Sequence, residues 1–407
     1  MGEATAAVLY GVEDLRIETF DLPEVGDDDA LLLVEACGLC GTDHELFTGH
    51  IGAPYPVVPG HETVGTIEAI GDEAAAKWKI NVGDRVAVEC WQACGGCDPC
   101  RAGVYRRCTK HGQTDLYGMI PTDRKPSLFG GYSTHHYLSP DSLVLPVPPE
   151  LNPVEATLFN PLGAGIKWGV EIPGTQQGDY VAILGPGIRG LCALVATQDI
   201  GAEFVAVTGY GPNDHPRLEM AEAMGADLVV DVAEEDAAKR FRDATGGRLA
   251  DVVIDVTANA PTALGQAVRL SAVDGTIVMA GVRGEKGAPG LNSDAIIWKE
   301  LTVKGALGVD APVYRKALEL LAQRKFPFDL FTRREVGLND TAELLADMAG
   351  KGSAPPPVHG VKFYILYNFY IIFTIRLFID KFMYTLIYIK LHKIFVFSYK
   401  LKHLIFS

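Results

Sequence analysis

The sequence predicts an α/β protein of two domains, one rich in β-strands and one built on a doubly wound parallel sheet. The chain has 407 residues, more than one ordinary hydrophobic core accommodates. Residues 1–155 consist of short β-rich runs bounded by Gly, Pro or Asp. Residues 156–304 alternate apolar runs with Ala- and Leu-rich stretches, the pattern of parallel strands joined by crossover helices.

The individual elements follow from the same patterns. The first domain is expected to hold strands at Ala6–Tyr10, Ala30–Cys37, Val64–Ile70 and Arg85–Cys90. The second is expected to alternate strand and helix over Tyr180–Leu184, Leu191–Ile200, Phe204–Thr208, Arg217–Met224 and Asp251–Val256. Residues 305–360 return to mixed short elements, so we expect them to rejoin the first domain.

The composition argues against several kinds of partner. Hydrophobic residues make up 48% of the chain and charged residues 21%, as in a soluble globular protein. A net charge of -15 argues against nucleic acid and anionic membranes. Met1–Ala30 is acidic and lacks the basic-then-apolar start of a secretory signal, so a cytoplasmic protein with reduced thiols is expected.

Residues 361–407 differ in composition from the rest of the chain. They include no Ala, Gly, Pro, Glu, Gln, Cys or Trp, and seven Lys or Arg accompany one Asp. Because these amino acids largely have AT-rich codons and those of the body GC-rich ones, we expect a foreign or mis-joined segment outside the fold. A membrane anchor is the alternative, although the longest uncharged run, Phe363–Ile375, has 13 residues and a spanning helix needs roughly 20. An interfacial basic and aromatic segment is a further alternative.

Two groups of residues carry metal-ligand chemistry. Cys94, Cys97, Cys100 and Cys108 lie in one short loop, and four thiolates at such spacing can close a tetrahedron around zinc. Since protein would fill all four positions, this site is predicted to be structural. The second group consists of Cys40 and the distant pair His61-Glu62. Their spacing in the sequence does not by itself identify them as metal ligands.

A glycine-rich string marks a dinucleotide site. Gly185-Pro-Gly187-Ile188-Arg189-Gly190 follows an apolar strand and opens a helix, which lets a pyrophosphate approach the helix N-terminus. The next strand ends Val207-Thr208-Gly209-Tyr210, with no acid to read the ribose 2′-hydroxyl. Thr208 and Arg217 could instead meet a 2′-phosphate, so the sequence favours NADP, with NAD as the alternative.

Other residues have two interpretations each. Thr257 and Gly281 follow two later strands and are expected to line the nicotinamide side, with core packing as the alternative. A substrate pocket or the core could equally be formed by Trp91, Phe129, Ile296 and Trp298.

Six motifs in order resemble those of the zinc-containing medium-chain dehydrogenases/reductases, the alcohol, sorbitol, threonine and glucose dehydrogenase group. The resemblance covers about residues 5–357 and rests on Cys40-Gly-Thr-Asp43, Pro59-Gly-His-Glu62, Val82-Gly-Asp-Arg-Val86, the four-cysteine loop, Gly130-Gly-Tyr132 and the glycine-rich string. It implies a GroES-like catalytic domain over 1–155 and 305–360 and a Rossmann domain over 156–304. It also implies one catalytic and one structural Zn²⁺, NAD or NADP, an alcohol, polyol or carbonyl substrate, and a homodimer or homotetramer.

The same resemblance implies roles for the residues around Cys40. Cys40 and His61 resemble catalytic zinc ligands, while Asn160 stands where relatives carry Cys, Asp or Glu. Because an amide oxygen is a weaker zinc ligand than a thiolate or carboxylate, we expect Glu62 to complete the set, with Asn160 nearby or bound through water.

Three further residues resemble the family's proton-handling groups. Asp43 resembles the carboxylate that orients a zinc-bound imidazole, Thr42 the hydroxyl that passes on the substrate proton, and Glu45 a later group of that relay. Their plainer alternatives are a turn aspartate, a helix N-cap and a solvated carboxylate.

The implied chemistry is hydride transfer between the nicotinamide and a substrate oxygen-bearing carbon, with zinc as the Lewis acid. Two other functions stay open, a zinc-free enone or quinone reductase of the same fold and an inactive family member. The cysteine motifs speak against the first, and Asn160 and the tail raise the second. The particular substrate cannot be derived from the sequence.

Overall fold

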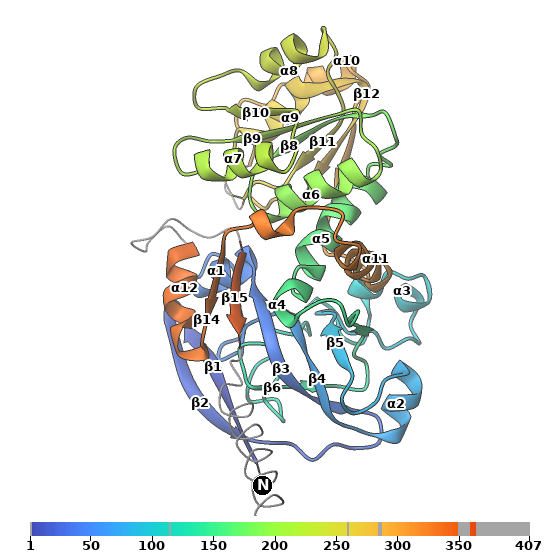
Figure 1. Ribbon diagram of the computed structural model, residues 1–407, viewed down its shortest axis with the longest axis vertical. Helices are drawn as coiled ribbons and strands as arrows, with labels where there is room; N and C mark the ends of the chain where they lie inside the picture. The colour runs from blue at the N-terminus through green and yellow to red at the C-terminus, as the bar shows by residue number, and fades with distance from the viewer. Residues whose placement is uncertain (1, 114, 259, 284–286, 349–358, 364–407) are drawn as a thin grey trace, which may run out of the picture. The chain divides into compact units, whose positions relative to one another are not determined.

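The computed structural model describes residues 2–113, 115–258, 260–283, 287–348 and 359–363. These residues belong to one compact unit, Met1–Phe363. Figure 1 shows two groups of strands with helices around them, one group from the middle of the chain and one from both ends. Among the helices of the described ranges, none combines the length and the apolar character that a bilayer crossing needs.

The middle of the chain forms a six-stranded parallel sheet in the order β10-β9-β8-β11-β12-β13. This order is that of a doubly wound dinucleotide-binding fold, whose switch point here lies between β8 and β11. The strands are β8 (Tyr180–Leu184), β9 (Phe204–Gly209), β10 (Leu228–Asp231), β11 (Ala250–Asp255), β12 (Ser271–Met279) and β13 (Thr302–Gly305). Between them run α6 (Ile188–Asp199), α7 (His215–Ala223), α8 (Ala237–Thr245), α9 (Ala263–Leu270) and α10 (Ser293–Trp298).

Successive side chains of β8 point to opposite faces of this sheet, and helices bury both faces. Val181 and Ile183 belong to a core cluster with residues of α6 and α7. Ala182 and Leu184 belong to a second cluster with residues of α8 and α9. The uninterrupted apolar run of β8 therefore has a structural reason, and the prediction of a parallel sheet is confirmed.

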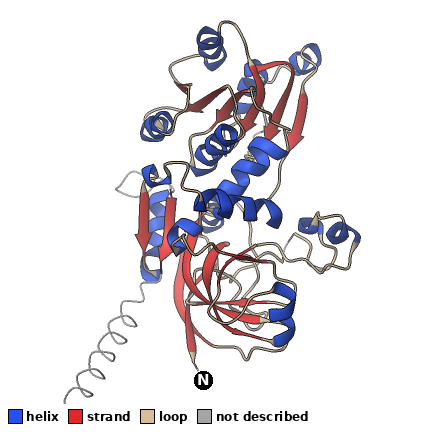
Figure 2. Cartoon of the chain, turned by 45° about the vertical axis from the view of Figure 1, so that its right-hand side comes forward, coloured by secondary structure: helices blue, strands red, loops and turns tan. Residues whose placement is uncertain are grey.

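The N-terminal and C-terminal parts form a seven-stranded sheet in the order β14-β15-β3-β4-β5-β7, with β6 pairing with β3. Its strands are β3 (Ala30–Leu39), β4 (Glu62–Ile70), β5 (Arg85–Val88), β6 (His135–Leu138), β7 (Val144–Pro146), β14 (Arg333–Val336) and β15 (His359–Phe363). A separate antiparallel pair is made by β1 (Glu3–Gly11) and β2 (Asp14–Asp21). Figure 2 distinguishes these strands in red from the short helices beside them, α1 (Gly41–Phe47), α2 (Asp72–Trp78), α3 (Asp98–Arg101), α4 (Pro153–Ala156) and α12 (Thr341–Met348).

The boundary predicted for the atypical tail differs from the structure. Val361 is buried and pairs with Gly38 of β3, and Lys362 is buried with its Nζ donating to the Ser133 carbonyl at 2.7 Å. The tail prediction therefore began too early, because Val and Phe are as typical of a strand as of the apolar tail. Residues 364–407, which hold the rest of that prediction, lie outside the described residues.

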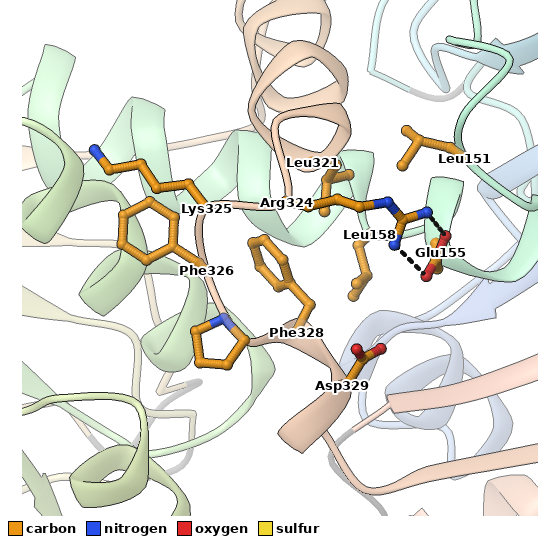
Figure 3. Close-up of a pocket in the computed structure, with 10 residues that line it drawn as sticks. Leu151, Glu155, Leu158, Leu321, Arg324, Lys325, Phe326, Phe328 and Asp329 are labelled. Carbon is orange, nitrogen blue, oxygen red and sulfur yellow. Dashed lines mark hydrogen bonds and ion pairs between the residues drawn. The ribbon is translucent and has the colours of Figure 1, made fainter.

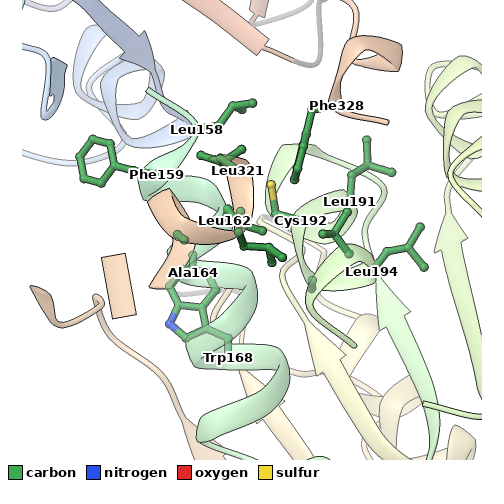
Figure 4. Close-up of a cluster of buried hydrophobic side chains, with 14 of the residues drawn as sticks. Leu158, Phe159, Leu162, Ala164, Trp168, Leu191, Cys192, Leu194, Leu321 and Phe328 are labelled. Carbon is green, nitrogen blue, oxygen red and sulfur yellow. The ribbon is translucent and has the colours of Figure 1, made fainter. Parts of the chain in front are cut away.

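A buried apolar cluster links the two sheets through α5 (Phe159–Ile166), α6 and α11 (Ala311–Ala322). Figure 4 shows Leu162 of α5, Leu191 and Cys192 of α6, and Leu321 of α11 among the side chains of this cluster. This packing fixes the helix that carries Asn160 against the helix that the glycine-rich string opens. Every strand and helix predicted from the sequence is present, with boundaries displaced by at most three residues.

Candidate metal and coenzyme site

The first candidate metal cluster is formed by Cys40, His61 and Glu62. Cys40 follows β3 and caps α1, whereas Glu62 begins β4 directly opposite Gly38 in the antiparallel pair. Pairing of the two strands therefore brings the distant segments together. The three side chains are buried, and one potential ligand atom from each lies within 4.8 Å of the others.

Asp43 connects the members of this cluster. Its Oδ2 accepts the Cys40 backbone N–H at 2.9 Å, and its Oδ1 accepts the Gly60 N–H at 3.2 Å. The same Oδ1 lies 3.4 Å from His61 Nδ1. A buried carboxylate against one imidazole nitrogen fixes the ring and leaves the other nitrogen to face a ligand. The structure thus places Asp43 where the predicted positioning role requires it.

The pKa values of the three side chains are shifted by burial and by neighbouring charges. Burial opposes ionisation of Cys40, but the Arg189 guanidinium and His61 outweigh it and lower the thiol pKa to about 6. Burial and the Cys40 thiolate raise the pKa of Glu62 well above its usual value. Burial would lower the pKa of His61, but Asp43 raises it well above the usual range.

This donor set fits a zinc ion. A thiolate, an imidazole and a carboxylate are three ligand types that zinc takes at catalytic sites. The Cys40 thiolate disfavours ionisation of Glu62, and a divalent ion bound to both side chains would add its charge to that of Arg189 and stabilise the two groups as anions.

Asn160 is buried in α5, and its Nδ2 donates to the Tyr314 hydroxyl at 3.1 Å. With the amide nitrogen used in this way, Oδ1 is the remaining acceptor for a metal or a water. Tyr314 in turn feels the charge of Arg189, which places this pair close to the cluster. No local signal around Tyr314 marked it in the sequence, because its contact with Asn160 is purely tertiary.

The residues predicted to move the proton lie on α1. Thr42 is partly buried, with Oγ1 3.7 Å from Cys40 Sγ. Glu45, one helical turn further on, is partly buried and has a pKa raised first by burial and then by Cys40, while His50 lowers it. His50 Nδ1 lies 2.8 Å from Thr48 Oγ1 and is exposed. His50 was not predicted, and it extends the polar groups of α1 to the surface.

Arg189, predicted only as part of the coenzyme turn, reaches the metal cluster. Its Nη2 lies 2.9 Å from Cys40 Sγ, and its Cζ lies 4.9 Å from the centroid of the Trp168 ring. Trp168 is itself fixed, because its Nε1 donates to the Gly308 carbonyl at 3.2 Å. The sequence placed Arg189 beside phosphate, and the structure places its side chain beside a thiol.

The second candidate metal cluster contains Cys94, Cys97, Cys100 and Cys108, around the short helix α3. Their sulfur atoms all lie within 4.8 Å of one another, with 3.9 Å between Cys94 and Cys100 and between Cys97 and Cys108. Zinc–sulfur bonds of about 2.3 Å in a tetrahedron require sulfur atoms roughly 3.8 Å apart. Backbone N–H groups of Thr109 and Cys100 lower the pKa of Cys97 to about 6, which favours the thiolate that zinc binds.

The glycine-rich turn lies between β8 and α6. Gly185 has a φ of +103°, which L side chains rarely adopt, and a Cβ on Gly190 would lie 1.9 Å from the Gly185 carbonyl oxygen. Nothing stands within 4 Å of a Cβ built on Gly187, the residue that caps α6. The turn is therefore tight on its protein side and open at Gly187, with Ile188 beginning the helix.

The end of β9 has acidic neighbours that the sequence pattern did not reveal. Thr208 is buried, and its carbonyl accepts the Gly185 N–H at 3.0 Å. Arg217 Nη1 lies 3.4 Å from Asp214 Oδ1. Asp231, at the end of β10, accepts N–H groups of Gly211 and Ala233 and lies 2.7 Å from His215. Carboxylates therefore lie beside this loop, although none stands at the tip of β9 itself.

Thr257 and Gly281 meet where β11 and β12 end. The Thr257 N–H and hydroxyl donate to Asp255 Oδ1 at 3.1 and 2.6 Å, and a Cβ on Gly281 would lie 1.8 Å from the Thr257 carbonyl oxygen. Arg283 forms a buried ion pair with Asp255 and donates from Nε to the Ala260 carbonyl at 3.0 Å. This ion pair, which was not predicted, fixes the strand ends around the predicted nicotinamide side.

A hollow of about 300 Å³ lies elsewhere, between α4 and the end of α11. Figure 3 shows the side chain of Arg324 bonded to Glu155, with Phe328 among the other residues that line the hollow. None of the predicted site residues lines this hollow, so it is separate from the candidate site.

Comparison with known sequences and structures identifies the family. The alcohol dehydrogenase GroES-like domain matches residues 26–149, and the zinc-binding dehydrogenase domain matches residues 190–323. A protein of Mycobacterium tuberculosis named as a probable alcohol dehydrogenase is 56% identical over 357 residues, which cover 88% of this chain and 97% of that protein. The chain belongs to the zinc-containing medium-chain dehydrogenase family.

More distant members agree with this assignment. Sorbitol dehydrogenase of Bacillus subtilis is 32% identical over 84% of this chain and 89% of its own length. The crystal structure of 2R,3R-butanediol dehydrogenase of B. subtilis superimposes with a TM-score of 0.75 at 26% identity, over 89% of this chain and 99% of that one. A zinc-binding dehydrogenase of Sinorhizobium meliloti bound to NADP gives the same TM-score and identity, over 89% of this chain and 100% of that one. The chain is an alcohol dehydrogenase-like oxidoreductase, and these relatives favour zinc-dependent chemistry over a zinc-free reductase.

Proposed function

We propose that this dehydrogenase oxidises small polyols or vicinal diols, or reduces the matching carbonyls, at a zinc held by Cys40, His61 and Glu62. The observation that carries the proposal is the convergence of these three buried donors within 4.8 Å, with Arg189 of the coenzyme turn touching Cys40. The relatives named for sorbitol and butanediol support a substrate with neighbouring hydroxyl groups.

The residues of the chain have distinct tasks in this reaction. When bound, the zinc ion supplies Lewis acidity and the nicotinamide exchanges a hydride with the substrate carbon. Asp43 holds the His61 ring in one orientation, and Glu62 adds the negative charge that Asn160 lacks. The Thr42 hydroxyl takes the substrate proton and passes it toward Glu45 and solvent.

The coenzyme contacts follow from the turn and from the strand ends. We assign the pyrophosphate to Gly185–Gly190 at the start of α6, and the nicotinamide side to Thr257 and Gly281. NADP is the coenzyme we favour, with Thr208 and Arg217 meeting the 2′-phosphate. Asp214 and Asp231 oppose this choice, but both already accept backbone N–H groups of the surrounding loops.

A panel of polyols, diols and simple alcohols with NADP and NAD tests the substrate and coenzyme together. We expect the largest kcat/KM for a vicinal diol or polyol with NADP and a lower preference for NADP in Arg217→Met. A strong preference for NAD in the wild type would contradict the coenzyme assignment.

Metal analysis tests the ligand assignment independently of turnover. Cys40→Ser and Glu62→Gln should each lose the catalytic zinc and keep the structural one. Cys192→Ser, which alters a buried thiol of α6 with no assigned role, is the matched control and should keep both. Full zinc content and full activity in Glu62→Gln would contradict the assignment of Glu62 and shift attention to Asn160.

We further propose a homodimer formed through the edge strand β13. This strand has one neighbour in the sheet, and beside it Ile297, Trp298 and Val303 are 70%, 81% and 42% exposed. The alternative that Trp298 is part of the core is wrong, because the residue is exposed. Trp298→Asp with Val303→Lys should give monomers by light scattering, while Val12→Lys, an exposed apolar residue elsewhere, should not.

We also place this dehydrogenase in the cytoplasm. All eight cysteines are free thiols, and four of them form a cluster that suits metal rather than disulfides, as expected in a reducing compartment. Fractionation of the native source, with detection of the chain, would test this assignment. Recovery with secreted proteins would contradict it.

A further inference from the structure

Arg189 brings a positive charge to the junction of the metal cluster and the coenzyme turn. Its guanidinium is held at both ends, by Cys40 Sγ at 2.9 Å and by the Trp168 ring, whose centroid is 4.9 Å away. The side chain is only partly buried, whereas Cys40 is 4% exposed. The guanidinium is therefore more accessible from solvent than the thiol.

The charged groups around Arg189 determine the net charge at this position when a ligand is bound. Cys40 and Glu62 are the anionic groups nearest to it, and both are assigned to the zinc ion. Two anionic ligands balance a divalent ion, so in the loaded site the guanidinium leaves one net positive charge. Asp43 does not cancel it, because its carboxylate is already committed to His61 and to two backbone N–H groups.

The nicotinamide ring must lie close to this charge. This step rests on the proposed function, in which hydride passes between the ring and a substrate whose oxygen is at the metal cluster. Direct transfer requires reacting atoms about 3–3.5 Å apart, so the ring lies within a few ångströms of the cluster. The oxidised ring carries a positive charge and the reduced ring is neutral.

We propose that Arg189 makes this dehydrogenase bind the reduced coenzyme in preference to the oxidised one, so that the reduced form binds more tightly and the oxidised form is released more readily. The guanidinium destabilises only the complex with the oxidised ring, since the neutral ring feels little Coulomb repulsion.

The size of the effect follows from Coulomb's law. Two like charges about 6 Å apart at an effective dielectric of about 20 repel each other strongly enough to change a Kd by roughly a hundredfold. Because Arg189 is partly exposed, solvent weakens this repulsion, and we expect a change of about tenfold.

The test compares dissociation constants of NADPH and NADP measured by calorimetry on the full-length, zinc-loaded enzyme, without turnover. Arg189→Met and Arg189→Gln remove the charge, and Gln keeps a donor for Cys40 Sγ if Met disturbs folding. We expect the ratio of the NADP Kd to the NADPH Kd to fall about tenfold in both. Arg189→Lys should keep most of the ratio, and Arg240→Met, which changes a partly exposed arginine of α8, should keep all of it.

If the ratio of the two Kd values were unchanged in Arg189→Met and Arg189→Gln, the inference would be overturned. It would also be overturned if the ratio in Arg189→Lys fell as low as in Arg189→Met. Failure of the wild type to bind either coenzyme would instead contradict the proposed function. Changes common to both coenzymes, such as a reshaped pocket, cancel in the ratio. The measurement therefore separates the charge of Arg189 from its packing.

Discussion

The Nδ1 of His61 lies 3.4 Å from Oδ1 of Asp43, and both side chains are buried. Asp43 lies in α1, which follows β3, and His61 directly precedes β4, so the register of these two strands brings the two side chains together. We expect Asp43 to act as a positioning residue, because its carboxylate contacts a candidate metal ligand and also accepts the N–H of Cys40.

Asp43→Asn should therefore weaken zinc binding at the catalytic cluster. The amide keeps the shape of the side chain but loses the charge that orients the imidazole, and such changes typically cost about 10–100-fold in metal affinity. Competition with a chelator measures this affinity directly. Asp329→Asn, at an exposed position, should leave it unchanged, and an unaltered affinity in Asp43→Asn would show that its hydrogen bonds matter more than its charge.

Cys108→Ser should remove the structural zinc and leave the catalytic one. Cys108 is the buried member of the four-cysteine cluster, and its thiolate closes the tetrahedron. Zinc content should fall from two ions per chain to about one, and Tm should fall by several degrees because metal binding contributes to folding. Retention of both ions, by elemental analysis, would mean that this loop does not bind zinc.

Two buried histidines should make stability fall in acid. Burial lowers the pKa of His136 and that of His359 to about 3, and within the described residues the ring nitrogens of His136 find no hydrogen-bond partner. An unfolded histidine has a pKa near 6.5, so the unfolded chain binds more protons between these values. The stabilisation is present above about pH 6.5 and is lost as the pH falls toward 3.

His136→Phe provides the check, because it removes the titrating group and keeps a ring against Tyr117. At pH 5 each histidine should cost about 2 kcal/mol of unfolding free energy relative to pH 7. The difference between urea unfolding at pH 7 and pH 5 should therefore shrink by about that amount in the variant. An equal difference in wild type and variant would mean that His136 is hydrated or protonated in the folded enzyme.

The second and third glycines of the turn should respond differently to alanine. Gly190→Ala would place Cβ 1.9 Å from the Gly185 carbonyl oxygen, so it should lower both Tm and coenzyme affinity. The Cβ of Gly187→Ala would have no neighbour within 4 Å in the described part of the chain, so this variant should keep Tm while weakening the approach of the pyrophosphate. Thermal unfolding and coenzyme titration together distinguish the cases. Equal loss of Tm in both would contradict the geometry of the turn.

Features formed by contiguous residues were predicted from the sequence, whereas contacts between distant residues were not. The glycine turn, the cysteine loop and the Pro-Gly-His-Glu string are continuous in sequence, and their order fixes the family and hence both domains. Within the site, Arg189 belonged to such a string, but its direction depends on α5 and α6 packing together, which no local pattern encodes. Tyr314 was not found because its contact with Asn160 joins elements far apart in sequence.

The pair of Arg283 and Asp255 was missed for the same reason, and it makes the strongest prediction on stability. Asp255 is 0% exposed and Arg283 8%, so removing one partner leaves a buried charge without compensation. Arg283→Met should lower the free energy of unfolding by about 3–5 kcal/mol, measured by urea titration. Asp255→Asn combined with Arg283→Met should recover part of that loss, since no lone charge remains. A double variant as unstable as the sum of the single ones would show that the two side chains act independently, each through its backbone hydrogen bonds.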